Sequence, residues 1–227
     1  MSNEGSNPVV ARGDYGIISY SQEGEDVVLR RFVGESKGFY VDLGAHHPQR
    51  FSNTYYYYKL GWNGINVDAD PDLIEEFNIE RPNDINISTG IGEPSEDLTF
   101  YVFNERAVNT FDKKLATMRE GIKGWKIVER RTVPVVSIVE LLDKHLPRKK
   151  IIDFMTVDIE GKDLEALRTN DWEKYRPRFL LIECYDMDSI TDERNKIIEY
   201  LAEQEYITVA RTYLTNIFAD TRTYGKK

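Results

Sequence analysis

FYVDLGAHHP, at residues 39–48, is the stretch that decides how this chain folds. Residues 39–43 are apolar apart from Asp42, which predicts a buried strand with an acid near its end, and the chain then turns at Gly44. A parallel α/β sheet that binds a nucleotide-like ligand has this arrangement, because a glycine there lets the ligand approach the main chain. The ribose hydroxyls then need a second acid after the next strand. Asp68, in GINVDADP at residues 64–71, lies about where that acid is expected, roughly 20 residues further on.

Strands and helices alternate along the rest of the chain. Turn and capping signals predict helices that begin at Ser21, near Ser52 or Asn53, at Pro71, at 138, after Gly161 and at 195. Apolar runs predict strands at 39–43, 65–67, 85–87, 98–103, 133–136, 151–157, 179–182, 206–210 and 216–218. We therefore predict an α/β fold of the Rossmann-like class I methyltransferase type. It has a seven-stranded, mostly parallel sheet with an antiparallel C-terminal hairpin and helices on both faces.

One domain with short flanking segments is expected from this pattern. Residues 1–20 are predicted to be an N-terminal arm, 21–220 a single methyltransferase domain, and 221–227 a C-terminal tail. Residues 104–131 are irregular, rich in charge and longer than most connections between strands. Because such connections are more often functional than passive, we expect this insertion to be a lid that recognises the substrate.

The composition restricts the classes of function. The chain has 227 residues, 41% hydrophobic and 30% charged, which is typical of a soluble globular protein. Its net charge of −9 disfavours nucleic acid or an anionic membrane as the main partner. The single cysteine, Cys184, excludes an intrachain disulfide framework. No apolar run approaches the roughly 18 residues of a membrane span, and no secretory signal follows Met1. We expect a cytoplasmic protein without a membrane span, and a homo-oligomer remains compatible with the sequence.

Five motifs occur in a characteristic order: SQEGED at 21–26, VDLGA at 41–45, SNT at 52–54, GWNGINVD at 61–68 and DFMTVDIEG at 153–161. Their order and spacing resemble the FkbM family of S-adenosylmethionine-dependent methyltransferases, from about Tyr20 to Phe218. The family's usual first motif has a second glycine where this chain has His47-Pro48. The resemblance implies O-methylation of a small-molecule hydroxyl. The acceptor would be a sugar, a nucleotide-linked sugar, or a phosphorylated or secondary metabolite, in polysaccharide or secondary-metabolite biosynthesis.

The resemblance also implies that S-adenosylmethionine lies across the turn after the first strand. Asp68 would accept hydrogen bonds from both ribose hydroxyls, and charge-assisted bonds of this kind are about twice as strong as neutral ones. Residues 52–54 would meet the ligand's carboxylate at a helix N-terminus. The expected cofactor-binding residues are Gln22, Asp26, Asp42, Gly44, Ala45, Ser52, Asn53, Thr54, Asp68, Ala69, Gly90 and Ile91. For Asp42 and for Asp68, each taken alone, a role as an ordinary turn former at a strand end remains open.

Methyl transfer to a hydroxyl also needs a group that takes up the proton. Residues that follow the first strand and the 151–157 strand are the candidates: His46, His47, Asp158 and Glu160. Glu183 ends the neighbouring strand, so a second hypothesis is that Asp158 and Glu183 bind Mg²⁺ or Mn²⁺, which would hold an oxygen nucleophile. The structural alternative for residues 158–161 is a polar turn that opens a helix.

Recognition of the acceptor is expected from the insertion, at Arg106, Asn109 and Thr110. Arg106, Arg130 and Arg131 would suit an anionic, phosphate-type acceptor, and solvated surface charge is the competing interpretation.

Two other classes of protein suit the sequence less well. A nicotinamide dehydrogenase of this fold has Gly-x-Gly-x-x-Gly after the first strand, and DLGAHH at residues 42–47 lacks it. A non-catalytic cofactor-binding protein stays open, because carboxylates at several strand ends argue against it only weakly.

Overall fold

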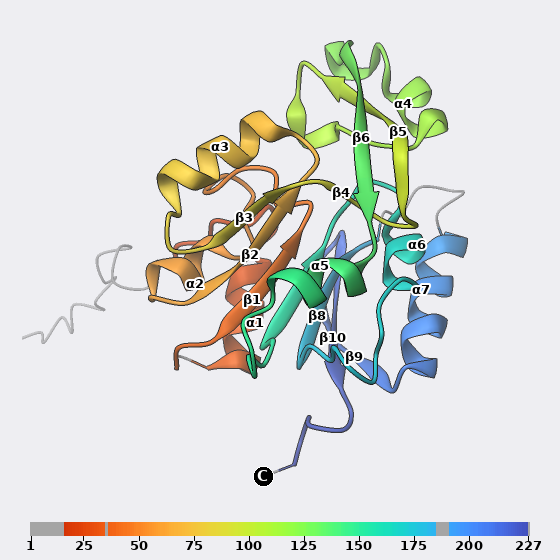
Figure 1. Ribbon diagram of the computed structural model, residues 1–227. Coiled ribbons are helices and arrows are strands. Elements are labelled where there is room, and N and C mark those ends of the chain that lie inside the picture. The colour runs from red at the N-terminus through yellow and green to blue at the C-terminus, as the bar shows by residue number, and fades with distance from the viewer. Residues whose placement is uncertain (1–15, 35, 185–190, 227) are drawn as a thin grey trace, which may run out of the picture.

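The computed structural model describes residues 16–34, 36–184 and 191–226. Its centre is a seven-stranded sheet in the order β3-β2-β1-β7-β8-β10-β9 (Figure 1). In that order the strands are Ile85–Ser88, Asn63–Asp68, Phe39–Leu43, Phe154–Val157, Phe179–Glu183, Thr215–Asp220 and Tyr206–Arg211. Neighbours from β3 to β8 are parallel, and β10 is antiparallel to both β8 and β9. The predicted sheet with its antiparallel C-terminal hairpin is confirmed.

Helices cover both faces of this sheet because its central strands are apolar on both sides. On one face, α5 (Ile138–His145), α6 (Asp163–Leu167) and α7 (Thr191–Glu203) pack around Val41 and Met155. On the other face, α1 (Glu25–Val33) and α2 (Tyr55–Lys59) pack around Tyr40 and Phe154. One further helix packs on the main sheet: α3 (Pro71–Glu80) contacts β2 and β3.

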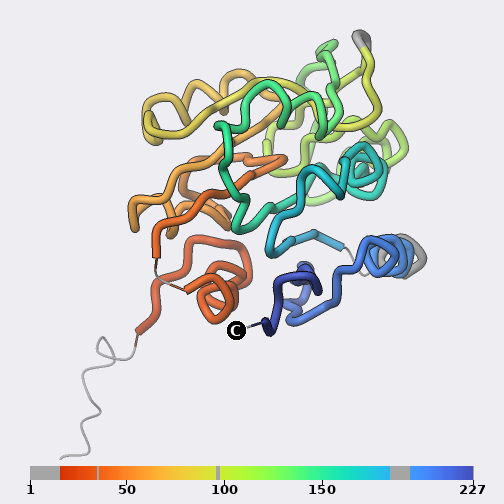
Figure 2. The backbone as a smooth tube through the Cα atoms, turned by 60° about the horizontal axis from the view of Figure 1, so that its bottom comes forward, coloured from red at the N-terminus to blue at the C-terminus, as the bar shows by residue number. Residues whose placement is uncertain are grey.

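The start of the described chain lies beside its last strands (Figure 2). The hydroxyl of Thr212 donates a 2.8 Å hydrogen bond to the carboxylate of Glu25, and the backbone N–H of Leu214 donates one of 2.8 Å to Glu23. The backbone N–H of Cys184, directly after β8, donates to the carbonyl of Leu214. The segment before α1 is therefore held at the carboxyl edge of the sheet.

A second, smaller sheet stands over that edge (Figure 1). Its order is β4-β6-β5, with β4 at Gly90–Ile91, β6 at Ile127–Val136 and β5 at Ser95–Phe103. Between β5 and β6 lie η1 (Arg106–Val108), α4 (Lys113–Arg119) and η2 (Ile122–Gly124). The prediction of an irregular insertion over 104–131 is wrong at its end, because residues 127–131 belong to β6. The backbone partner of this charged stretch is β5, and pairing with a neighbour outweighs weak strand propensity.

Several helix ends follow the local signals. The side chain of Asp70 accepts a 3.1 Å bond from the N–H of Asp72, and Ser137 and Glu140 form the predicted capping box. The predicted helix start at Ser21 is wrong. Gly24 precedes α1 in a left-handed conformation (φ 89°), and a helix cannot run through such a residue.

Other predicted boundaries also differ from the observed ones. Helix α2 begins at Tyr55, strand β5 at Ser95, strand β7 at Phe154 and helix α7 at Thr191. Within the described ranges, no helix is long and apolar enough to cross a membrane.

Candidate functional site

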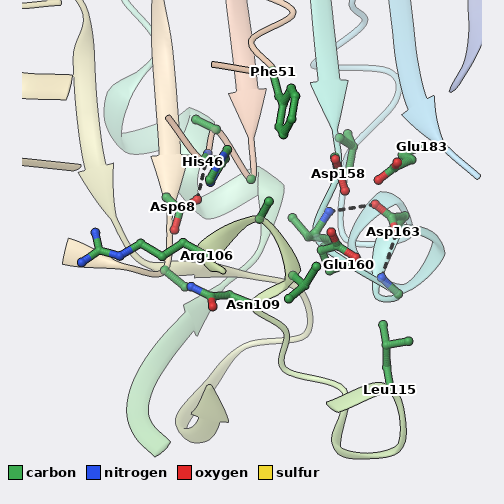
Figure 3. A pocket seen from close by; sticks show the side chains of 18 of the residues that line it. His46, Phe51, Asp68, Arg106, Asn109, Leu115, Asp158, Glu160, Asp163 and Glu183 are labelled. Carbon is green, nitrogen blue, oxygen red and sulfur yellow. Dashed lines mark hydrogen bonds between the residues drawn. The ribbon is translucent and has the colours of Figure 1, made fainter. Parts of the chain in front are cut away.

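A cavity of about 960 Å³ opens at the carboxyl ends of β1, β2, β7 and β8. The strand ends supply Asp42, Asp68, Asp158 and Glu183 to its wall. The insertion between β5 and β6 supplies the opposite wall, including Asn109 and Leu115 (Figure 3). A ligand in this cavity therefore touches both the sheet and the insertion.

Asp68 ends β2 and lies beside His46 in the cavity wall (Figure 3). Its Oδ2 accepts a 3.0 Å hydrogen bond from the backbone N–H of His46, and its Oδ1 accepts one of 2.8 Å from the backbone N–H of Asp70. Burial raises the pKa of the Asp68 carboxyl to about 7, against the opposing effect of these two N–H groups. Because each carboxylate oxygen has two lone pairs, the group can still accept hydrogen bonds from a ligand.

Gly44 joins the end of β1 to the following turn with φ 83°, a left-handed conformation that favours glycine. A Cβ at this position would lie 1.8 Å from the backbone carbonyl oxygen of Asp158. The sequence suggests a glycine that makes room for a ligand. The structure adds a second reason, which is the close packing of β1 against the end of β7.

A buried arginine holds the segment that follows the turn. The Thr54 hydroxyl donates a 2.7 Å hydrogen bond to Asp42 and accepts one of 2.8 Å from Arg81, whose side chain is fully buried. Arg81 also donates to the Ser52 hydroxyl at 2.7 Å and to the Pro48 carbonyl at 2.8 Å. Segment 48–54 is thus fixed over β1. Burial raises the pKa of Asp42 to about 6, against the bond from Thr54 and the positive charge of Arg81.

Three carboxylates gather where β7 and β8 end. Asp158, Glu160 and Glu183 each place one oxygen atom within 4.8 Å of the others, and Figure 3 shows all three around one region. Asp163 shapes the loop between them by accepting bonds from the backbone N–H groups of Ile159 (3.0 Å) and Gly161 (3.3 Å). The Oδ1 atom of Asp158 is buried and has no hydrogen-bond partner among the residues that the structure describes. We call Asp158, Glu160 and Glu183 the carboxylate cluster.

The pKa values of all three carboxyls in this cluster are raised. For Asp158, burial and then the negative charge of Glu183 hold the pKa well above its usual range. Burial, and then Asp158, raise the pKa of Glu160 to about 8, although the neighbouring Arg119 opposes this. Burial raises the pKa of Glu183 to about 7. The cluster therefore retains protons near neutral pH, a property common among groups that transfer protons.

Four non-glycine residues in the cavity wall have a left-handed backbone: His46 (φ 53°), Phe51 (φ 57°), Lys123 (φ 51°) and Glu160 (φ 57°). Such conformations cost about 1–2 kcal/mol each and concentrate at functional sites. The ring of His46 stacks on Phe51 with centroids 6.4 Å apart, and both of its nitrogens are buried without a partner in the described part of the chain. Because burial lowers the pKa of His46 to about 4, its imidazole is neutral at neutral pH.

Most residues predicted from the sequence line this one cavity. They are Gln22, Asp42, Gly44, Ala45, His46, Ser52, Asn53, Asp68, Ala69, Gly90, Ile91, Arg106, Asn109, Asp158, Glu160 and Glu183.

Four predicted residues, Asp26, His47, Thr54 and Thr110, do not line the cavity. Asp26 pairs with Arg30 at 3.0 Å, and Nδ1 of His47 accepts hydrogen bonds from two backbone N–H groups of its own turn. The Thr110 hydroxyl donates to the Glu160 carbonyl at 2.8 Å. These polar groups support the wall instead of facing a ligand.

The insertion presents a polar amide to the cavity, while its arginines already have partners. Oδ1 of Asn109 accepts a hydrogen bond from the N–H of Phe103 at 2.8 Å, whereas its Nδ2 is buried and has no partner within the described ranges. Arg106 lies 3.7 Å from Asp70 and also near Asp72 and Glu76 on α3.

The two other candidate arginines for an anionic acceptor have partners outside the cavity wall. Arg131 contacts Asp70 at 3.1 Å and Glu129 at 2.8 Å, and Arg130 lies over the ring of Tyr101.

Three residues that shape the site were not predicted from the sequence: Arg81, Arg119 and Asp163. Arg81 ends a helix and Arg119 stands in a charged insertion, where most arginines are solvated, so neither carries a local signal of burial. Asp163 had a usable signal, because an acid shortly after a strand-end acid often accepts hydrogen bonds from the turn between them.

One protein family and two solved structures are similar to this chain. The chain matches the family described as methyltransferase FkbM domain over residues 42–208. One similar solved structure is a methyltransferase FkbM from Methylobacillus flagellatus KT, with 16% identity, a TM-score of 0.43, 82% of this chain and 44% of that chain covered. Another is the delta-N METTL16 MTase domain, with 12% identity, a TM-score of 0.43, 85% of this chain and 77% of that one covered.

This chain thus spans less than half the length of the Methylobacillus protein, at 44%. No curated protein matches it. The family match covers most of the chain and includes the ends of β1, β2, β7 and β8. The chain therefore belongs to the FkbM methyltransferase family.

Proposed function

We propose that this protein transfers a methyl group from S-adenosylmethionine to a hydroxyl group of a small molecule. The observation that carries the proposal is that Asp68 and the carboxylate cluster line the same cavity, on either side of the end of β1. A ribose-binding acid and a proton acceptor are thereby held at the ends of β2 and β7, the two strands that flank β1, in the wall of one cavity. The predicted single domain, residues 21–220, remains part of this proposal.

The residues present suit this cofactor. Asp68 keeps free lone pairs for a ribose diol, and the segment 52–54 is fixed by Arg81 where a carboxylate is expected. His46 offers a neutral imidazole whose two nitrogens lack partners, which supports a role in holding the cofactor. Gly90 and Ile91 form the edge of the cavity that would take the adenine. When bound, S-adenosylmethionine supplies an electrophilic methyl group.

The chain's own contribution to the reaction is alignment and proton transfer. We assign Asp158 as the group that takes the proton from the acceptor hydroxyl, because its Oδ1 is buried and unpartnered in the cavity wall. Burial and the negative charge of Glu183 keep the pKa of Asp158 raised, which makes it a stronger base when it is ionised. Asn109 provides an unpaired donor for the acceptor.

The ion pairs of Arg106 and Arg131 indicate which charge the acceptor carries. Arg106 already lies beside three acids of α3, and Arg131 is paired with Asp70 and Glu129. Binding a phosphate there would require these contacts to break. This supports a neutral hydroxyl compound, such as a sugar or secondary metabolite, over a phosphate-type acceptor.

Isothermal calorimetry with S-adenosylhomocysteine and with NAD tests the cofactor. We expect binding of S-adenosylhomocysteine alone; no binding, or binding of NAD alone, would reject the proposal. A screen of S-adenosylmethionine against neutral polyols, phenols and their phosphorylated counterparts then tests the reaction. Methylation of the phosphorylated members only would reject the neutral acceptor.

A second candidate is a metal-dependent O-methyltransferase, and the carboxylate cluster favours it. Three oxygens within 4.8 Å of one another suit a hard divalent cation such as Mg²⁺ or Mn²⁺. Asp158 and Glu183 would be the ligands from the strand ends, and Glu160 would be the third. The cation would supply charge that favours the deprotonated acceptor oxygen. Turnover that is unchanged after dialysis against EDTA would exclude this candidate, and loss of turnover restored by Mg²⁺ would establish it.

A further inference from the structure

Arg119 reaches from the insertion to the carboxylate cluster. It is the last residue of α4, its side chain is 9% exposed, and its Nη2 pairs with Oε2 of Glu160, which is 12% exposed. The other terminal nitrogen, Nη1, donates a 3.1 Å hydrogen bond to the carbonyl of Val108. One guanidinium therefore joins two parts of the insertion to the loop after β7.

Glu160 is held at both its backbone and its side chain. The Thr110 hydroxyl donates a 2.8 Å hydrogen bond to the Glu160 carbonyl, while Arg119 holds the carboxylate. The loop reaches this shape only because Glu160 (φ 57°) and Gly161 (φ 93°) are both left-handed, with Asp163 accepting from the backbone on either side. The side chain of Glu160 is consequently directed toward Asp158 and Glu183, as Figure 3 shows.

Acidic side chains outnumber buried basic side chains around the carboxylate cluster. Four acids, Asp158, Glu160, Asp163 and Glu183, line this end of the cavity. Among the described basic residues of the cavity wall, Arg50 pairs with Glu105, and Arg106 lies beside α3. The lysines of the wall, Lys114 and Lys123, are exposed. Arg119 is therefore the buried positive charge that faces the four acids.

We propose that Arg119 is a positioning residue that acts through Glu160: it is the counter-charge of the carboxylate cluster and withholds Glu160 from a divalent cation. A cation that enters the cluster then meets the carboxyl groups of Asp158 and Glu183 without that of Glu160, and among the described residues Oδ1 of Asp158 has no partner and can bind it or a proton. This inference deepens the proposed function, on which it rests.

Binding of Mn²⁺ alone, followed by its electron paramagnetic resonance signal in the full chain, tests the inference without knowledge of the acceptor. Arg119→Met removes the positive charge and releases the Glu160 carboxylate. We therefore expect the affinity of this variant for Mn²⁺ to be higher than that of the wild type by a factor of about ten or more. Arg119→Lys keeps the charge and should restore the wild-type affinity to within about threefold. Arg106→Met is the matched control, since Arg106 lines the same cavity but contacts α3. It should leave Mn²⁺ binding unchanged.

A double-mutant cycle identifies Glu160 as the ligand that is released. Glu160→Gln alone should change Mn²⁺ affinity little, whereas Glu160→Gln in the Arg119→Met background should abolish the gain. Equal Mn²⁺ affinity in the wild type and Arg119→Met, including no binding to either, would overturn the proposal. An equal gain in Arg106→Met would also overturn it, because a general change in charge would then explain the effect.

Circular dichroism checks that each variant is folded, and Arg119→Gln replaces Arg119→Met if the latter is not. Calorimetry with S-adenosylhomocysteine separates this inference from the proposed function. A wild-type protein that does not bind S-adenosylhomocysteine contradicts the function, whereas one that does, with unchanged Mn²⁺ affinity in Arg119→Met, contradicts only the role of Arg119.

Discussion

The backbone N–H of His46 donates a 3.0 Å hydrogen bond to the carboxylate of Asp68. This bond joins the turn after β1 to the end of β2, and it forms because His46 takes up a left-handed conformation. The same carboxylate also accepts from the N–H of Asp70, ahead of α3. One side chain thus organises two turns and faces the cavity between them.

Asp68→Ala should weaken binding of S-adenosylhomocysteine by about 30-fold or more, because hydrogen bonds to a charged group contribute about 1.5–3 kcal/mol each. Calorimetry measures the loss. Asp72→Ala is the control, since Asp72 is an exposed acid at the start of α3 and should leave affinity unchanged. Unchanged affinity in Asp68→Ala would remove Asp68 from the cofactor site.

Asp158→Asn should separate catalysis from binding. The amide has the same shape but cannot take a proton, so turnover should fall by about 100-fold or more. The affinity for S-adenosylhomocysteine should stay within about twofold, because Asp68 is untouched. An equal loss in both quantities would assign Asp158 to cofactor binding.

The same Asp158→Asn substitution should stabilise the protein at high pH. It removes the negative charge that Asp158 carries beside Glu183 once the pH exceeds its raised pKa, so the melting temperature of the variant should then be above that of the wild type. Differential scanning calorimetry measures this. A fall in the melting temperature would indicate that the carboxylates are held by attractive contacts.

The free energy of unfolding should fall as the pH rises from about 5 to about 8. Asp42, Asp68, Glu160 and Glu183 have pKa values raised to about 6, 7, 8 and 7 in the folded state. In the unfolded chain these groups titrate near pKa 4, so the folded state binds more protons across this window and loses stability as they ionise. Urea unfolding at a series of pH values measures the effect. Stability that rises with pH over this range would contradict it.

Gly44→Ala should destabilise the fold by more than about 3 kcal/mol. The added Cβ would lie 1.8 Å from the carbonyl oxygen of Asp158, and φ 83° is unfavourable for alanine. Gly121→Ala separates the two causes, because Gly121 has φ 90° but no atom within 4 Å of its Cβ position. We expect it to cost only about 1–2 kcal/mol. Equal losses in urea unfolding would show that backbone conformation alone matters at Gly44.

Much of the site was accessible from the sequence because its residues stand at strand ends. Asp42, Asp68, Asp158 and Glu183 each follow an apolar run, and parallel strands bring their carboxyl ends to one edge. Asp26 and Thr54 belong to two of the five motifs and His47 follows a third, yet their side chains satisfy neighbouring groups. Motif membership places a residue near the site, but the direction of its side chain depends on the local backbone.

The sequence by itself determined the seven-stranded sheet, its antiparallel end and the acids along its carboxyl edge, because apolar runs and turn signals act over a few residues. Only the tertiary structure decided that residues 127–131 form a strand, since their partner is β5. It also decided the burial of Arg81 and Arg119, whose hydrogen-bond partners lie far away in the chain. The carboxylate cluster depends on both, because the acids stand at predicted strand ends while the left-handed turn at Glu160 and the ion pair with Arg119 bring them together.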